Sequence, residues 1–412
     1  MKKTKVGIIG LGYVGLALTR ALCKSDIEVV GIDTNLERVQ QMRSGISPNE
    51  SISNEEIKYF TRQSLLQIST LPEDIRDCDV VIIAVPTPLD KFGQPDYLPL
   101  KSACESVGEY LKPKALLINE STSHPGTLRD FIIPIIRSKR ADHGKDLLFA
   151  CSPERVNPGD NSHGLRNTPR VVSGLGDEAK SAVKSFYSTF VEHVHLADTP
   201  EIAEMSKLLE NAFRLVNIAF INELNDYCHV KGIALRDVIE AASTKPFGFM
   251  AFKPGPGIGG HCIPVDPEYL LKDAEGIGLD LEILKSAALS NRDRPQRILE
   301  FIGTNFGDMR NSRILLEGVT YKSNIADIRE SPTIQLLERM KSEGFTLVKW
   351  RDPLIKSLES FEKGFPEKET FDLILLMVTH NQSDLESLQR TGAKIVDFTD
   401  SFVPDGKTIF SF

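Results

Sequence analysis

Short apolar runs, separated by amphipathic stretches, dominate the first half of the chain. The runs are rich in Val, Ile and Leu and lie at 5–10, 28–33, 79–87, 115–120, 147–152 and 170–174. A strand that is covered by helices on both faces is apolar along its whole length, and strands that alternate with helices form parallel sheets. The pattern therefore predicts an α/β fold with a doubly wound parallel sheet.

The pattern changes near Pro200. Residues 201–232 contain no proline and show no strand character, and they end in Lys231-Gly232, which is typical of the end of a helix. Residues 280–302 indicate another helix, interrupted near Pro295. A long helix between two α/β units commonly packs against the same helix of a second chain. We therefore expect a homodimer that forms through the helix at 201–232.

The last part of the chain returns to alternation and resembles the first part. Apolar runs lie at 312–322, 345–353, 372–380, 393–398 and 407–412, GIDTN resembles KWRDP, and VVIIAVPTP resembles LILLMVTHN. We therefore expect two Rossmann-like doubly wound domains, at 1–199 and 303–412, joined by a helical domain at 200–302. Only Gly318 stands at the first turn of the second copy, so only the first copy has a full dinucleotide fingerprint.

Composition limits the classes of partner. The chain has 412 residues, 41% of them hydrophobic and 26% charged, and a net charge of −8, which argues against nucleic acid and membrane surfaces as partners. Glycines break the apolar N-terminus, and no long apolar run follows, so we expect a cytoplasmic protein. The six cysteines are scattered and the histidines lack ligand spacing, so we expect neither disulfides nor a bound metal.

The segment Gly10-Leu11-Gly12-Tyr13-Val14-Gly15 carries a dinucleotide fingerprint. It follows a predicted strand and opens a predicted helix, and Asp33 ends the next strand. Glycines at these positions let the backbone approach a pyrophosphate, and the acid accepts hydrogen bonds from the ribose. The acid favours NAD over NADP, although Arg38 could face a 2′-phosphate. The alternative is a structural glycine turn.

Polar residues follow three more predicted strands. Thr87 ends the third strand, Ser121 and Thr122 follow Glu120, and Glu154 and Arg155 follow Cys151. Each segment alone could be an ordinary loop. Ligands of open α/β sheets bind beyond the carboxyl ends of the strands, so together the segments predict one crevice.

Two further pairs have a spacing of four residues. Lys207 and Asn211 share one face of the long predicted helix and suit the stabilisation of an oxyanion, unless they form an exposed charged face. Cys262 and Asp266 lie in GPGIGGHCIPVDP, at 255–267. A thiol with a nearby base or a lowered pKa is a nucleophile, whereas a small buried cysteine is equally consistent with the composition.

Seven segments, in order, carry a resemblance along nearly the whole chain. They are GLGYVGLAL, VPTPLD, ESTSHPGT, SPERVNPGD, KLLENAFRLVNIAFINEL, TKPFGFMAFKPGPGIGGHCIPVDP and GVTYKSNIADIRESP. The chain resembles the UDP-glucose/GDP-mannose dehydrogenase family. The resemblance implies an NAD-binding Rossmann domain, a central helical dimerisation domain and a C-terminal domain that binds a UDP-sugar.

The resemblance also implies a four-electron oxidation of the sugar's sixth carbon to a carboxylate. Cys262 would form a thiohemiacetal with the intermediate aldehyde, and a second oxidation would give a thioester that water releases. By the same resemblance Lys207 and Asn211 stabilise oxyanions, Asp266 and Thr122 hold a water, and Glu154 serves thioester hydrolysis. The remaining implied contacts are Arg155, Val156, Lys253, Gly259, Tyr321 and Lys322 for the substrate, and Thr87, Ser121 and Arg329 for the cofactor.

Departures from the family pattern bear on the substrate. Pro158 replaces a second glutamate of the UDP-glucose branch, and SPERVNPG and GPGIGGHCIP resemble the branch that acts on UDP-N-acetylhexosamines. TKPFGFMAF favours UDP-N-acetylglucosamine, with UDP-N-acetylmannosamine and UDP-glucose as alternatives. From other classes, a two-electron hydroxy-acid dehydrogenase and a non-catalytic nucleotide sensor stay open. IVDFTDSF lacks an arginine of many relatives, and we assign no site there.

Overall fold

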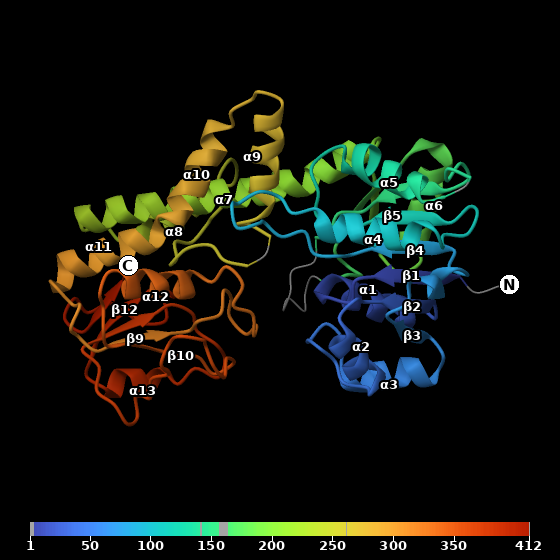
Figure 1. The fold of residues 1–412 in the computed structure, drawn as a ribbon. Coiled ribbons are helices and arrows are strands. Elements are labelled where there is room, and N and C mark those ends of the chain that lie inside the picture. The colour runs from blue at the N-terminus through green and yellow to red at the C-terminus, as the bar shows by residue number, and fades with distance from the viewer. Residues whose placement is uncertain (1–3, 141, 156–163, 261, 412) are drawn as a thin grey trace. The chain divides into compact units, whose positions relative to one another are not determined.

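The computed structural model describes residues 4–140, 142–155, 164–260 and 262–411 (Figure 1). The chain folds into two compact units, Met1–Glu210 with Glu268–Asp273, and Asn211–Pro267 with Ala274–Phe412. The helical middle of the chain therefore groups mostly with the C-terminal part. The three-domain division at residues 199 and 302 stays a prediction.

The first unit is built on an eight-stranded sheet with the strand order β3-β2-β1-β4-β5-β6-β7-β8. Its first six strands in this order are parallel and have the doubly wound arrangement of dinucleotide-binding folds. β7 runs antiparallel to β6, which the apolar pattern did not indicate. The strands are β1 (Lys5–Ile9), β2 (Glu28–Ile32), β3 (Leu66–Ser69), β4 (Val80–Ile83), β5 (Leu116–Asn119), β6 (Leu148–Cys151), β7 (Arg170–Gly174) and β8 (Val194–Leu196).

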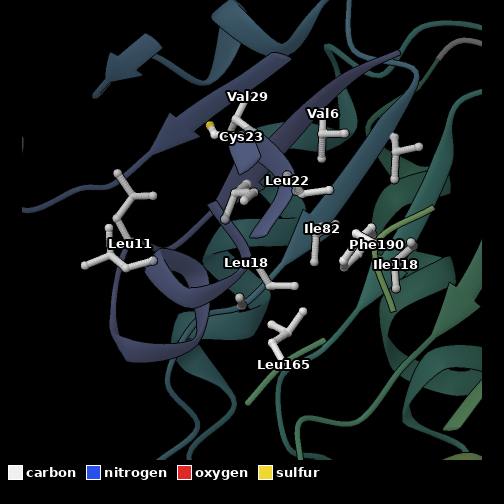
Figure 2. Packing of buried hydrophobic residues seen from close by; sticks show 14 of the residues in the cluster. Val6, Leu11, Leu18, Leu22, Cys23, Val29, Ile82, Ile118, Leu165 and Phe190 are labelled. Atoms are coloured by element: carbon white, nitrogen blue, oxygen red, sulfur yellow. The ribbon is translucent and has the colours of Figure 1, made fainter. Parts of the chain in front are cut away.

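The two faces of this sheet are buried under different helices, because successive strand residues point to opposite sides. In β4, Val80 and Ile82 join a cluster with α1, α2, α3 and α6, part of which Figure 2 shows, whereas Val81 and Ile83 join a cluster with α4 and α5. Both faces being covered explains the continuous apolar strands. The helices are α1 (Tyr13–Lys24), α2 (Leu36–Arg43), α3 (Asn54–Arg62), α4 (Leu98–Gly108), α5 (Ile133–Ser138) and α6 (Gly176–Tyr187), with a 3₁₀ turn at Pro72–Ile75 and a π-helical turn at Thr127–Ile132.

The long helix predicted at 201–232 is confirmed as α7 (Pro200–Lys231). Its proline stands in the first turn, where the missing N–H costs nothing, and Gly232 follows it with a φ of 67°, as expected for a helix that ends on glycine. The helix predicted at 280–302 divides at Asp293 into α10 (Glu282–Arg292) and α11 (Arg294–Phe306), and Pro295 lies in the first turn of α11. Two more helices are α8 (Leu235–Ser243) and α9 (Asp266–Gly276).

The second unit contains a five-stranded parallel sheet with the order β10-β9-β11-β12-β13. α11 and α12 cover one face and α13 the other, so this sheet is also buried on both sides. Its elements are β9 (Ile314–Glu317), α12 (Pro332–Ser342), β10 (Val348–Arg351), β11 (Leu373–Leu376), α13 (Leu385–Arg390), β12 (Lys394–Asp397) and β13 (Ile409–Ser411). The predicted fold class is confirmed, with two Rossmann-like sheets and a long central helix.

The internal repeat extends to single hydrogen bonds. Asp33 accepts a bond from the N–H of Leu11 at 2.8 Å, and Asp352 accepts one from the N–H of Val319 at the same distance. Gly10 and Gly318 both have positive φ and both donate to the strand that leads to this aspartate. The resemblance between GIDTN and KWRDP therefore reflects the same turn in both sheets.

Two strands escaped the apolar pattern because they are not buried along their whole length. β3 has an exposed residue between buried ones, and β8 is largely open to solvent. In the part of the chain that the structure describes, no helix has both the length and the hydropathy of a membrane span.

Candidate functional site

The glycine turn after β1 is shaped by close backbone approaches. A Cβ on Gly10, whose φ is 97°, would lie 2.6 Å from the carbonyl oxygen of Ala84, and one on Gly15 would lie 1.8 Å from that of Gly10. A Cβ on Gly12 would meet nothing within 4 Å. Gly10 and Gly15 thus permit close backbone packing within the turn, whereas Gly12 leaves open space at the N-terminus of α1.

This open space fits a dinucleotide phosphate. Gly12 caps α1, whose first turn contains no acidic residue, so the positive end of the helix dipole is not neutralised there. Tyr13 and Val14 begin the helix and are partly buried. Asp33 also accepts from the N–H of Asn35 at 2.8 Å and from the guanidinium of Arg38 at 2.8 Å. The Arg38 side chain is thus turned toward Asp33, the acid predicted to meet the ribose.

The predicted strand-end residues come together beside this turn. The hydroxyl of Ser121 donates to the carbonyl oxygen of Val85 at 2.8 Å and so ties the end of β5 to the end of β4. Thr87 is buried, and its carbonyl oxygen accepts from the hydroxyl of Tyr269 at 2.9 Å. The ammonium group of Lys207 donates to the Thr122 hydroxyl, and both side chains are buried. A lysine of α7 is therefore joined to the end of β5.

Glu204 is a site residue that the sequence analysis missed. It lies on α7, one turn before Lys207, and accepts from the N–H groups of Gly126 at 2.7 Å and Leu128 at 2.9 Å. Burial raises the pKa of its carboxyl to about 7. Glu204 holds the loop that follows Thr122 against α7. An acid inside an apolar helix stretch was the available signal.

Glu154 follows β6 and is held at both carboxylate oxygens. It accepts from the N–H of Arg155 at 2.7 Å and from the guanidinium of Arg170 at 2.9 Å. The guanidinium of Arg155 itself pairs with the carboxylate of Glu210 at 2.6 Å. Val156 and Pro158 lie outside the described residues. Arg170 was not predicted as a site residue.

In the second unit, α7 meets the segment that carries the thiol. The amide of Asn211 donates to the carboxylate of Asp266 at 2.7 Å, and both side chains are buried. The N–H of Asp266 donates to the carbonyl oxygen of Cys262 at 2.8 Å in the turn that begins α9. Cys262 is exposed, whereas the other cysteines are buried, and burial raises the pKa values of Cys23, Cys78 and Cys104 to about 12. The interpretation of Cys262 as a buried structural cysteine is wrong.

The glycines of the thiol segment permit contact with a distant part of the chain. A Cβ on Gly259 would lie 2.5 Å from the carbonyl oxygen of Glu330, and one on Gly260 would lie 2.7 Å from the ring of Tyr321. The N–H of Gly260 donates to the carbonyl oxygen of Arg329 at 3.0 Å. Residues 259–260 therefore pack against residues 321–330, and these two ranges contain four of the predicted ligand-binding positions, Gly259, Tyr321, Lys322 and Arg329.

Two asparagines that were not predicted hold the same loop. The side-chain oxygen of Asn222 accepts from the N–H of Gly255 at 2.9 Å, and that of Asn291 accepts from the N–H of Ile258 at 2.8 Å. Lys253 is exposed before the loop, and Lys322 is partly exposed after Tyr321. The Arg329 guanidinium pairs with Asp327 at 2.5 Å. Among the described residues, no group of three or more His, Cys, Asp and Glu side chains is arranged to hold a metal.

Three models of one protein family match successive parts of the chain. Residues 4–191 match the NAD binding domain of the UDP-glucose/GDP-mannose dehydrogenase family, residues 201–293 its central domain, and residues 314–411 its UDP binding domain. These ranges include the glycine turn, α7 with Lys207 and Asn211, the thiol segment and Tyr321. The three matched domains follow one another in the order NAD binding, central and UDP binding along the chain.

Characterised relatives span the chain. A UDP-N-acetyl-D-glucosamine 6-dehydrogenase of Pseudomonas aeruginosa is 34% identical over 93% of this chain and 92% of its own length. A UDP-N-acetyl-D-mannosamine dehydrogenase of Methanocaldococcus jannaschii is 32% identical over 95% of this chain and 90% of its own. The solved structure of a UDP-D-ManNAc dehydrogenase from Pyrococcus horikoshii superimposes with a TM-score of 0.86 at 29% identity, covering 99% of both chains.

Proposed function

The chain belongs to the UDP-glucose/GDP-mannose dehydrogenase family, and from this premise we propose that it oxidises the sixth carbon of UDP-N-acetylglucosamine to the uronic acid. It carries the family's NAD-binding domain and is an NAD-dependent UDP-sugar dehydrogenase. The observation that carries the four-electron proposal is the exposed Cys262, held beside the buried Asn211–Asp266 pair. A two-electron dehydrogenase that stops at the carbonyl product forms no thioester, so its chemistry does not require such a thiol.

The proposed substrate class rests on the N-acetylated relatives and on the motif SPERVNPG. Relatives at similar identity act on UDP-N-acetylglucosamine and on UDP-N-acetylmannosamine, so the choice of epimer rests on the segment TKPFGFMAF alone. We propose that Lys253, Gly259, Tyr321 and Lys322 bind the substrate. The contact between the thiol loop and residues 321–330 supports a shared role for them.

In the first oxidation, Asp266 and Thr122 hold a water that passes the proton of the sugar's hydroxyl group to the carboxylate of Asp266. Lys207 and Asn211 donate hydrogen bonds to the oxygen as negative charge develops on it. NAD, when bound at the glycine turn, would supply the hydride acceptor for both oxidations, so two NADH per sugar are expected. Lys207 and Asn211 are four positions apart on one continuous helix, and this spacing supports their action on one oxygen.

Cys262 then adds to the aldehyde as the thiolate, and the carbon–sulfur bond gives a thiohemiacetal. The π bond of the carbonyl opens as the carbon–sulfur bond forms, and the oxygen of the adduct can then expel the hydrogen of the same carbon as hydride, which the free aldehyde cannot do without forming an acylium cation. The second oxidation converts the adduct to a thioester. Glu154 takes a proton from the attacking water, the carbon–sulfur bond breaks, and the acid leaves.

For the cofactor, we propose that Gly10, Gly12, Tyr13, Val14 and Gly15 surround the pyrophosphate. Asp33 would bind the ribose, with Arg38 held against it, and Thr87, Ser121 and Thr122 would line the strand ends. Arg329 is proposed to contact the cofactor from the C-terminal part. Its guanidinium already has Asp327 as a partner, so this contact requires a change of partner or a shared one.

The test is a panel of UDP-N-acetylglucosamine, UDP-N-acetylmannosamine and UDP-glucose with purified enzyme and NAD. NADH absorbance gives the preferred sugar, and the ratio of NADH to sugar should be two. A ratio of one would exclude the four-electron mechanism. A preference for another sugar would overturn only the proposed choice of UDP-N-acetylglucosamine as the substrate. Cys262→Ser should abolish acid formation and leave NAD affinity unchanged.

We also propose a cytoplasmic homodimer that assembles through α7. Phe213, Phe220 and Tyr227 recur at intervals of seven residues on this helix and are all exposed. Residues seven apart lie on one side of a helix, so the three rings form an apolar stripe that suits a second copy of the chain.

A further inference from the structure

Arg170 is a fully buried arginine at the start of β7, in the unit that carries Glu154. Its guanidinium donates to the hydroxyl of Ser152 at 3.2 Å, to the carboxylate of Glu154 at 2.9 Å and to the carboxylate of Glu120. These residues stand at the ends of β5 and β6, next to the segments proposed to act on the substrate. One side chain therefore connects the buried Glu120 with the partly buried Glu154, two acids that lie 34 positions apart in the sequence.

We propose that Arg170 is a positioning residue that holds Glu154 in the orientation needed for thioester hydrolysis, and that Glu120 takes up the charge of Arg170. The inference rests on the proposed function of Glu154. Arg170 binds one carboxylate oxygen of Glu154 and the N–H of Arg155 binds the other, so the carboxylate cannot rotate without losing a bond. A planar guanidinium with several donors can serve two carboxylates at once.

Glu120 explains how this arrangement keeps Glu154 basic. An arginine paired with Glu154 alone would stabilise the carboxylate and lower its affinity for a proton, which would weaken it as a base. Glu120 is fully buried, shares the guanidinium with Glu154 and accepts a second hydrogen bond from the hydroxyl of Tyr187. Arg170 also lies over the ring of Tyr187, 5.4 Å from its centroid. Its charge is thus largely compensated on the side away from Glu154.

The pKa shifts of Glu120 and Arg170 agree with these two roles. Burial raises the pKa of Glu120 to about 7, against the lowering effect of Arg170. Burial alone would lower the pKa of Arg170, and the two carboxylates raise it well above its usual range. Arg170 therefore stays charged, and an ionised Glu120 compensates this charge at pH values above about 7.

The hydrolysis step defines what must be measured. Water forms a bond to the thioester carbon, Glu154 receives the proton that the water loses, and the electrons of the carbon–sulfur bond return to Cys262 as thiolate. Neither an oxidant nor a reductant takes part. A defect in this step alone leaves both oxidations intact, so each active site should form two NADH rapidly and then retain the sugar on Cys262.

The experiment compares Glu154→Gln, Glu120→Gln and Arg170→Lys with the wild-type enzyme, using the best UDP-sugar of the panel and excess NAD. Stopped-flow absorbance gives the NADH burst, the later steady rate gives hydrolysis, and intact mass after acid quench gives the adduct on Cys262. Arg166→Lys is the matched control, because Arg166 lies in the same segment but pairs with Glu192 at the surface. It should change none of these values.

Glu154→Gln should keep the burst and slow the steady rate by about 10²–10⁴-fold. Arg170→Lys should keep the burst and slow the steady rate at least tenfold, since a single ammonium cannot hold both acids. Glu120→Gln should change the hydrolysis pH profile by slowing the steady rate above about pH 7, where Glu120 is ionised in the wild-type enzyme, because the whole charge of Arg170 then acts on Glu154 and weakens it as a base. Should Arg170→Lys fail to fold, the isosteric Glu120→Gln decides the question.

The possible failures are distinguishable. A normal steady rate in Glu154→Gln would overturn the proposed role of Glu154 itself. A slow rate in Glu154→Gln, together with an unchanged rate in Arg170→Lys and an unchanged pH profile in Glu120→Gln, would overturn the role of Arg170 alone. Equal loss of burst and steady rate in Arg170→Lys would indicate a merely structural residue and would also overturn it.

Discussion

Replacing Gly260 by alanine tests whether the thiol loop depends on its contact with the C-terminal part of the second unit. Gly260 has a φ of 85°, a region that costs an L-residue about 1–2 kcal/mol. The added Cβ would also lie 2.7 Å from the Tyr321 ring, so the ring must shift by several tenths of an ångström. Overpacking of this kind costs about 1–3 kcal/mol. Together these terms predict a loss of about 2–5 kcal/mol in the free energy of unfolding.

Gly255→Ala is the matched control on the same loop. A Cβ there would meet nothing within 4 Å, and its φ lies outside the positive region, so we expect a change of at most about 1 kcal/mol. Urea unfolding measures both variants, and NADH-linked kinetics should show a raised KM for the UDP-sugar only in Gly260→Ala. NAD affinity should stay unchanged, because the glycine turn after β1 is not altered.

A double-mutant cycle with Tyr321→Ala separates the two causes. Removing the ring should relieve the overpacking part of the Gly260→Ala cost and leave the part that comes from φ, which gives a coupling energy of about 1–3 kcal/mol. Equal destabilisation by Gly260→Ala and Gly255→Ala would refute the reasoning. So would a Gly260→Ala cost that Tyr321→Ala does not reduce.

Three further predictions follow from exposure, charge and packing. Iodoacetamide should modify Cys262 in the native enzyme before Cys23, Cys78 and Cys104, and peptide mass spectrometry that finds all four modified together would contradict this. Because the pKa of Glu204 is raised, the folded state binds more protons than the unfolded state between pH 4.5 and about 7. The contribution of Glu204 to the free energy of unfolding is therefore full below pH 4.5. It falls by about 3 kcal/mol as the pH rises to about 7. Glu204→Gln should flatten that part of the curve of unfolding free energy against pH, and an unchanged slope would speak against it. Phe220→Asp should convert a dimer to a monomer in light scattering, whereas Val403→Asp, at an exposed residue between β12 and β13, should not. A dimer that survives Phe220→Asp would exclude the α7 interface.

Much of the fold could be predicted because both sheets are buried on both faces. That burial makes strands such as β4 and β11 uniformly apolar, and it makes α7 stand out as a long stretch without strand character. β3 and β8 could not be found in the same way, because both contain an exposed residue and so lack a continuous apolar run. The reversed direction of β7 was also hidden, since an apolar run does not reveal which way its neighbour runs.

The candidate site divides along similar lines. Residues in motifs of fixed spacing, such as Lys207 with Asn211 or Cys262 with Asp266, were accessible to sequence reasoning. Residues that act through a distant partner were not, because Arg170 and Glu120 are 50 positions apart and become neighbours only when β5, β6 and β7 assemble. A signal was nonetheless present, since opposite charges stood at the ends of two apolar strands, where an unpaired charge would be costly.

The repeat clarifies what distinguishes a dinucleotide turn from its copy. Asp33 and Asp352 close their turns with the same hydrogen bonds, so the acid alone does not define the function. Counting from Gly10 and Gly318, the position of Gly12 is taken in the second copy by Thr320, which is fully buried and contacts His380. His380 in turn reaches Asp352 at 3.1 Å, much as Arg38 reaches Asp33. The second turn is thus filled by its own side chains, whereas the first leaves the space beside Gly12 open, and that space rather than the acid is what a pyrophosphate requires.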